Sequence, residues 1–214
     1  MIVLLQTCDR SQYTRRTVDA FLRWNGPADF HLAVADDASG DTAGLQYATA
    51  HGFRPALLNQ ERAGVTVTLG RAVRRLFSEH GDDLILYLQN DCEFVRTLPL
   101  APVRAAMRTH DCVRLFGRFK GYGEPTKDRN GRTGHWRTLP AAEEMMSTGR
   151  ARWSDLPSVA RLSLILRLTE GARSEREMRR NGGRLRVACL ERNVVYHFGE
   201  QRTPNGLYCG TVSR

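Results

Sequence analysis

The sequence contains little lysine and no long apolar run. Only Lys120 and Lys127 are lysines among the 32 basic residues, so arginine carries the net charge of +9. No apolar run approaches the roughly 18 residues that a membrane helix needs. The first apolar stretch, residues 2–7, has no basic leader and is too short for a secretory signal. We therefore expect no membrane span and a cytoplasmic location.

Cysteines are few and are not paired in the sequence. No two of the five lie two to four residues apart, which disfavours a zinc knuckle. An odd number of cysteines in a chain without a signal sequence also argues against a disulfide framework. We expect buried free thiols at Cys8, Cys92, Cys112, Cys189 and Cys209.

Several nucleotide-binding and catalytic motifs are missing. No Gly-x-Gly-x-x-Gly follows the first apolar run, and no Gly-Lys-Ser/Thr phosphate loop occurs. A Gly-x-Ser-x-Gly elbow is absent as well. These absences disfavour a dinucleotide-dependent dehydrogenase, a phosphate-loop ATPase and a serine hydrolase of the α/β type.

Apolar runs alternate with amphipathic stretches over the first 95 residues. Such alternation predicts right-handed βαβ units and an α/β fold with a mostly parallel sheet. Ser11 is expected to cap the first helix, which Asn25-Gly26-Pro27 ends. The expected strands are 2–7, 30–35, 54–58 and 84–88, and the expected helices are 11–24, 42–51 and 67–80.

The second half is less regular. It predicts strands at 112–116, 185–190 and 193–197, a helix at 156–168 and a short charged helix at 174–181. Residues 117–135 are rich in glycine and basic side chains and predict a long loop. No linker divides the chain, so we expect a single domain over residues 1–214.

Polar clusters follow three of the predicted strands, at residues 7–10, 36–41 and 90–93. In parallel sheets, ligands bind beyond the carboxyl ends of the strands, so the three clusters should converge at one edge. Strand-end carboxylates suit a divalent cation, which takes oxygen ligands and completes its shell with phosphate oxygens.

The motifs at these positions resemble those of GT-A fold glycosyltransferases, particularly family two. The matches are Thr7-Cys8-Asp9-Arg10, Asp36-Asp37-Ala38-Ser39-Gly40-Asp41, Gln89-Asn90-Asp91-Cys92-Glu93 and the C-terminal Tyr196-His197-Phe198-Gly199. The resemblance implies a GT-A-like Rossmann-type sandwich and an enzyme that moves a sugar from a nucleotide-sugar donor to an acceptor hydroxyl. It divides the chain into a donor-binding half, residues 1–95, and an acceptor-binding half, residues 96–214.

The resemblance also implies roles for individual residues. The donor nucleotide would contact residues at the strand ends, where Asp36 binds the base or ribose and Arg62 faces the diphosphate. The proposed donor-binding set is Thr7, Asp9, Arg10, Asp36, Arg62 and Asn90. Asp91, Glu93 and His197 would hold Mn²⁺ or Mg²⁺, with Asp91 also counted as catalytic. Gln89 stands where the family has its first carboxylate.

A carboxylate before the Gly182-Gly183 pair is the expected general base. By position within the family pattern, Glu175 is the first choice, with Glu170 and Glu177 as rivals. Alternating charge on a solvated helix face is the competing interpretation of this stretch.

The acceptor is the least determined part of the function. A basic segment with interleaved aromatics, which includes Lys120, Arg129 and Arg132, suits a nucleic-acid backbone. A hydroxymethylated base in DNA, as modified by bacteriophage enzymes, is the leading hypothesis. Acceptors that are polysaccharides or lipid-linked, a nucleotidyltransferase, and a non-catalytic nucleic-acid-binding module remain alternatives.

Overall fold

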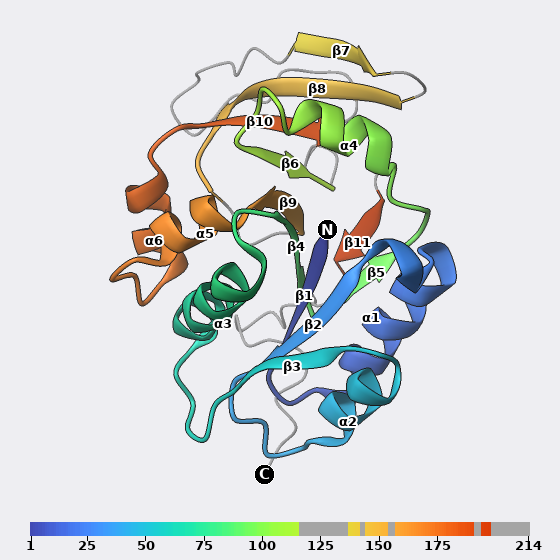
Figure 1. The fold of residues 1–214 in the computed structure, drawn as a ribbon, viewed down its shortest axis with the longest axis vertical. Helices are drawn as coiled ribbons and strands as arrows, with labels where there is room; N and C mark the ends of the chain where they lie inside the picture. The colour runs from blue at the N-terminus through green and yellow to red at the C-terminus, as the bar shows by residue number, and fades with distance from the viewer. Residues whose placement is uncertain (116–136, 142–143, 154–156, 191–193, 198–214) are drawn as a thin grey trace, which may run out of the picture.

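The computed structural model describes residues 1–115, 137–141, 144–153, 157–190 and 194–197, with the backbone alone for 137–141, 144–151 and 196–197. Its central feature is a nine-stranded sheet in the order β3-β2-β1-β4-β9-β6-β10-β8-β7 (Figure 1). The strands are β1 (Ile2–Thr7), β2 (His31–Asp36), β3 (Arg54–Leu58), β4 (Leu84–Gln89), β6 (Cys112–Arg114), β7 (Arg137–Ala141), β8 (Glu144–Ala151), β9 (Ser158–Arg161) and β10 (Leu185–Leu190).

The sheet is mixed but mostly parallel. All its strands except β9 and β8 run in one direction, since β9 pairs antiparallel with both β4 and β6, and β8 pairs antiparallel with β10 and β7. Two short strands, β5 (Cys92–Phe94) and β11 (Val195–His197), form a separate antiparallel pair. The predicted α/β class with a mostly parallel sheet is confirmed.

Helices cover both faces of the sheet, with α1 and α2 on one side and α3, α5 and α6 on the other (Figure 1). Successive residues of a strand point to opposite faces. Val3 and Leu5 therefore pack in the core under α1, while Ile2 and Leu4 pack in the core under α3. The helices are α1 (Ser11–Trp24), α2 (Ala43–Ala50), α3 (Val65–His80), α4 (Leu100–Ala106), α5 (Leu162–Thr169), α6 (Glu175–Gly182) and the 3₁₀ turn η1 (Pro27–Asp29).

The first half agrees closely with the prediction. The predicted bounds of β1, α1 and β3 match the structure, and those of β2, α2, α3 and β4 differ by one or two residues. The reason is the burial of the strands on both faces: all six residues of β1 are buried. A strand of this kind reads as a short continuous apolar run between turn signals.

The helix predicted at 156–168 is wrong in its first part. Ser158–Arg161 form β9, which pairs with β4 and β6 in the middle of the sheet, and the helix α5 begins only at Leu162. Val159 and Ala160 are fully buried. A central strand that is buried on both faces has no alternating pattern, so its sequence merges with that of the following apolar helix.

Other elements were not predicted. β5, α4, β7 and β8 have no counterpart in the sequence expectations, and β6 ends at Arg114. No helix among the described residues is both long enough and apolar enough to cross a membrane.

The predicted cap of α1 is also wrong. Arg10 occupies the N-cap position in a left-handed conformation, and Ser11 is the first helical residue. The Ser11 hydroxyl instead accepts a hydrogen bond of 2.8 Å from the backbone N–H of Gly44, at the start of α2. A Cβ at Gly44 would lie 2.9 Å from the Ser11 Cα, so only glycine permits this approach. The contact holds α1 and α2 together next to the strand ends.

Candidate active site

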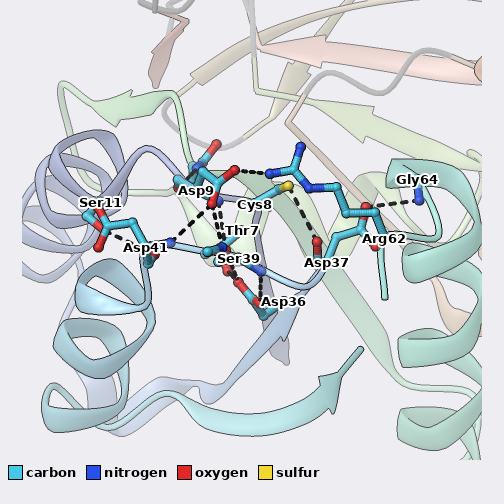
Figure 2. A network of polar contacts seen from close by, with 12 residues as sticks. Thr7, Cys8, Asp9, Ser11, Asp36, Asp37, Ser39, Asp41, Arg62 and Gly64 are labelled. Atoms are coloured by element: carbon cyan, nitrogen blue, oxygen red, sulfur yellow. Dashed lines mark hydrogen bonds and ion pairs between the residues drawn. The ribbon is translucent and has the colours of Figure 1, made fainter. Parts of the chain in front are cut away.

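The loops after β1 and β2 are joined through the carboxylate of Asp36. Its Oδ1 accepts hydrogen bonds from the Thr7 hydroxyl at 2.7 Å and from the Ser39 hydroxyl at 2.5 Å, and its Oδ2 accepts from the Ser39 N–H at 2.8 Å (Figure 2). Asp36 and Thr7 are both buried. The predicted donor residues Thr7 and Asp36 therefore lie in one network at the carboxyl edge of the sheet.

Asp9 extends this network across three loops. Its Oδ1 accepts from the N–H of Gly40 at 2.7 Å, its Oδ2 contacts the Arg62 guanidinium, and its own N–H donates to the Ser39 hydroxyl (Figure 2). Arg62 lies in the loop after β3, so the carboxylate connects the ends of β1, β2 and β3.

Three residues of these loops have a positive φ although they are not glycine: Asp9 (52°), Arg10 (55°) and Ala38 (54°). Left-handed backbone at such residues costs on the order of 1–3 kcal/mol each and persists only where neighbouring contacts hold it. Strain of this kind gathers at ligand sites, and among the described residues it is confined to the two loops that Asp36 and Asp9 join.

Asp37 anchors the loop that carries Arg62. Its carboxylate accepts hydrogen bonds from the N–H groups of Ala63 and Gly64 at 2.8 and 2.9 Å, and from Thr68 and Asn59 at 2.8 and 3.0 Å. Burial alone would raise the pKa of Asp37, but these four hydrogen bonds outweigh it and lower the pKa below its usual value.

We expect Asp37→Asn to destabilise the fold by about 2 kcal/mol at neutral pH, because two backbone N–H groups lose a charged acceptor. A carboxylate with a lowered pKa stabilises the fold above its unfolded pKa of about 4, and this contribution is lost as the pH falls through the folded value. The difference between wild type and variant should therefore shrink toward about pH 3. Urea denaturation at both pH values tests this, with the exposed Asp29→Asn as control. A pH-independent difference would contradict it.

The turn between β4 and β5 brings the third cluster to the same edge. The Asn90 amide donates to the Asp9 carbonyl at 3.3 Å and to the Thr14 hydroxyl at 3.4 Å. Asp91 is buried, and its Oδ2 lies 3.8 Å from an Nη of Arg10. The three strand-end clusters predicted to converge are thus in contact.

The predicted metal ligands are only partly described by the structure. Asp91 lies in the turn before β5 and not within a strand, so the argument that it shares a strand face with Glu93 does not apply. The Glu93 carboxylate pairs with Arg16 of α1. The backbone of His197 pairs with that of Cys92, the residue after Asp91. Among the described side chains, no group of three histidine, cysteine or acidic residues is placed to hold a metal ion.

The candidate bases lie around the start of α6. The Glu175 carboxylate accepts from the Arg179 guanidinium at 3.0 Å. Ser174 caps α6, since its hydroxyl accepts from the Glu177 N–H at 3.4 Å, and the Glu177 carboxylate accepts from the Arg173 N–H, just before the cap, at 2.6 Å. The bond from Arg173 is the main reason that the pKa of Glu177 is lowered. Glu170 ends α5.

A cavity lies between the loop that carries Arg62 and the segment that precedes α6. It has a volume of about 360 Å³, and Arg62, Arg71, Arg173 and Glu61 contribute to its lining. Arg62 comes from the loop that contacts Asp9, and Arg173 stands two residues before Glu175. Of the predicted donor residues, Arg62 lines this cavity, and α6 begins two residues after Arg173.

The structure does not describe the predicted nucleic-acid-binding residues. Lys120, Arg129 and Arg132 lie outside the described residues, as does the whole of the predicted loop at 117–135.

The comparisons with known proteins show the fold. No family model and no curated protein matches the chain. The structure is similar to that of S. aureus TarS 1-349, with a TM-score of 0.57 and 14% identity over 92% of this chain and 60% of that one. The complex of TarS 1-349 with UDP gives a TM-score of 0.56 and 13% identity over 91% of this chain and 59% of that one. The chain has an α/β fold of the GT-A type.

The likeness extends to one further TarS structure, with a TM-score of 0.56 and 15% identity over 91% of this chain and 36% of that chain. The chain thus spans less than two thirds of the length of the TarS chains that it matches.

Sequence reasoning missed the residues that organise the loops. Ser39 contacts both Asp36 and Asp9, and Asp37 holds the loop of Arg62. The motif contained both residues but did not reveal their distant partners: Asp9 lies 30 positions from Ser39, and Ala63 lies 26 positions from Asp37. A polar residue early in the following helix, here Thr68, was the available signal for the role of Asp37.

Proposed function

We propose that this protein is a glycosyltransferase that binds a nucleotide sugar at the carboxyl edge of β1, β2 and β4 and transfers the sugar to an acceptor hydroxyl. The observation that carries the proposal is the meeting of three strand-end loops, through Asp36, Asp9 and Asn90, in a fold of the GT-A type. In such folds the strand ends are where ligands bind. TarS 1-349, which has a similar fold, has been solved in complex with UDP, and this supports a nucleotide ligand.

Donor binding would use the two kinds of group that this edge offers. Buried carboxylates such as Asp36 accept hydrogen bonds from a base or ribose, and its Oδ2 has acceptor capacity beyond the bond from Ser39. Arg10 and Arg62 provide guanidinium groups for a diphosphate, to which arginine binds in a bidentate manner. Both now contact carboxylates, Asp91 and Asp9 respectively, so diphosphate binding would rearrange these pairs.

The residues present fit a divalent cation held jointly with the substrate. Mg²⁺ is commonly bound by one or two carboxylates together with phosphate oxygens. Asp91 supplies a carboxylate in a buried turn, and the β11–β5 register places His197 beside that turn. Asp91 and His197 are the ligands we favour, because a cation at Glu93 would have to displace Arg16. When bound, a cation would neutralise the charge that develops on the leaving diphosphate.

The transfer step itself needs a proton acceptor. The acceptor oxygen forms a bond to the anomeric carbon, the bond from that carbon to the diphosphate oxygen breaks, and the nucleoside diphosphate leaves. The proton of the acceptor hydroxyl passes to a carboxylate. We propose Glu175 for this role, since α6 begins next to the cavity that Arg62 and Arg173 line.

Thermal unfolding in the presence of a nucleotide panel tests the proposal. One of UDP, GDP, ADP or CDP should raise the melting temperature in the presence of Mn²⁺, because a ligand at about a hundred times its Kd adds about 2.7 kcal/mol to stability. The matching nucleotide sugars should then be hydrolysed. If no nucleotide raises the melting temperature with or without metal, the proposal is wrong.

The acceptor is proposed from the basic segment of the sequence alone. A hydroxymethylated base in DNA would offer the hydroxyl that an unmodified base lacks. The assay for it supplies plain and hydroxymethylated duplexes together with the active donor. Transfer to the hydroxymethylated duplex supports this acceptor, and no transfer to either duplex excludes it.

A further inference from the structure

An arginine-rich groove runs along α3 on the face of the molecule opposite α1. A second cavity, of about 660 Å³, shares Val67, Arg71 and Arg173 with the cavity at Arg62, so the two form one continuous hollow. One wall is α3, and the other is the connection from Thr169 to Arg173 between α5 and α6. We call this hollow the α3 groove.

The groove presents positive charge from both walls. Arg71, Arg74 and Arg75 stand on α3, where residues three and four apart share one face, and Arg173 faces them from the opposite wall. Arg75 pairs with Glu79, whereas Arg71, Arg74 and Arg173 have no carboxylate partner for their side chains among the described residues. Three exposed guanidinium groups therefore meet in the groove, and the acidic residue of its lining, Glu61, lies at the Arg62 end.

The groove suits a chain of phosphates better than a single anion. One turn of helix advances about 5.4 Å, so Arg71 and Arg75 are spaced along the groove and do not converge on one point. Gly70 brings the walls close together: a Cβ at this position would lie 2.9 Å from the Thr169 Cβ. Charges in a row along the hollow fit a single extended strand.

The lining of the groove also indicates which part of a nucleic acid the groove would not recognise. Among the described residues that line the two cavities there is no aromatic side chain. Proteins that hold single-stranded nucleic acid stack its bases on aromatic rings, which this groove does not offer. Recognition here would depend on phosphate alone.

We propose that the α3 groove binds the phosphodiester backbone of an extended acceptor chain, independently of any base, and leads its end to the strand-end site. That the bound chain is the acceptor rests on the proposed function, but the binding of a phosphodiester backbone in the groove does not. The groove opens at Arg62, whose guanidinium contacts Asp9, so a strand lying in it would reach the predicted donor residues.

Fluorescence anisotropy with two labelled probes tests the proposal, without donor, metal or turnover. The probes are an oligothymidylate of about ten nucleotides and an abasic phosphodiester chain of the same length. Both should bind with similar Kd, on the order of 10⁻⁴ to 10⁻⁶ M, and affinity should fall as salt rises from about 50 to 200 mM. Because no sugar is transferred in the assay, an inactive enzyme leaves its outcome unaffected.

Variants locate the binding. Arg74→Ala and Arg173→Ala, one from each wall, should each flatten the plot of log affinity against log salt by about 0.7, the value for one phosphate contact on a single strand. Arg104→Ala, an exposed arginine of α4 outside the groove, is the matched control and should leave the slope unchanged. Both groove arginines are exposed, so the variants should fold, which their melting temperatures verify.

Three results would overturn the proposal. The first is no binding of either probe at low salt. The second is an unchanged slope in both groove variants, which would place the binding elsewhere, for example in the basic segment at 117–137. The third is oligothymidylate binding more than about tenfold tighter than the abasic chain, which would show base stacking.

Discussion

Replacing Asp91 with asparagine should lower sugar transfer by at least about a hundredfold, while the protein remains folded. The change keeps the size of the side chain but removes the carboxylate that we propose as a ligand of the divalent cation. Hard cations bind carboxylate more strongly than amide oxygen, and the lost charge stabilisation of the leaving diphosphate is worth several kcal/mol. Turnover at saturating donor over a Mn²⁺ titration measures the effect.

The matched control for this change is Asp29→Asn, which alters an exposed carboxylate in η1 and should leave turnover unchanged. Because Asp91 is buried and lies 3.8 Å from Arg10, the melting temperature of Asp91→Asn must be measured in parallel. A second variant, Arg10→Gln, removes this ion pair but keeps the Asp91 carboxylate, so its melting temperature shows what loss of the pair alone does to stability. Near wild-type turnover in a folded Asp91→Asn protein would contradict the metal assignment.

The first half of the fold could be predicted because its signals are local. β1 is a run of buried residues with a helix directly after it, and β3 and α1 are bounded by turn residues. Strands joined by a helix were expected to lie parallel in one sheet, because βαβ units are right-handed. The edge at which Asp36, Asp9 and Asn90 meet was predictable for the same reason, since all three follow strands that point in one direction.

The second half depends on contacts between distant segments. β9 pairs with β4, about 75 positions earlier in the sequence, and with β6. It runs antiparallel to both of them. Nothing in the local sequence of Ser158–Arg161 distinguishes this strand from the start of α5. The same holds for α4, a helix of two turns that begins at Leu100 just after Pro99 and contains Pro102. Its stability comes from packing Val103 against the core, and not from its own propensity.

The individual contacts of the site could not be predicted from the sequence, for a related reason. The motif after β2 places Asp36 and Asp37 side by side, yet their carboxylates serve different loops: Asp36 joins β1 to β2, and Asp37 holds the start of α3. The strained backbone at Arg10 also depends on these neighbours. The α3 groove could not be predicted at all, because α3 and Arg173 become neighbours only through tertiary packing.

The second large effect is a loss of turnover, which we expect when Glu175 is replaced. If this carboxylate accepts the acceptor proton, Glu175→Gln should lower turnover by roughly two to four orders of magnitude. Donor affinity should change little, because the base acts on the acceptor and not on the nucleotide. The amide keeps the shape of the side chain and its position at the first residue of α6. Single-turnover transfer rates, together with nucleotide binding measured by calorimetry, separate the two quantities.

Glu177→Gln provides the comparison that makes this test specific. Glu177 lies on the same helix two residues later, but its carboxylate accepts a hydrogen bond from the Arg173 N–H, and this bond lowers its pKa and makes it a poorer base. We therefore expect Glu177→Gln to lower the melting temperature while turnover stays within about fivefold of wild type. The reverse pattern, a large loss for Glu177 and a small one for Glu175, would move the base to Glu177. If neither variant loses more than about fivefold, the base does not come from the start of α6, and Glu170→Gln is the next variant to measure.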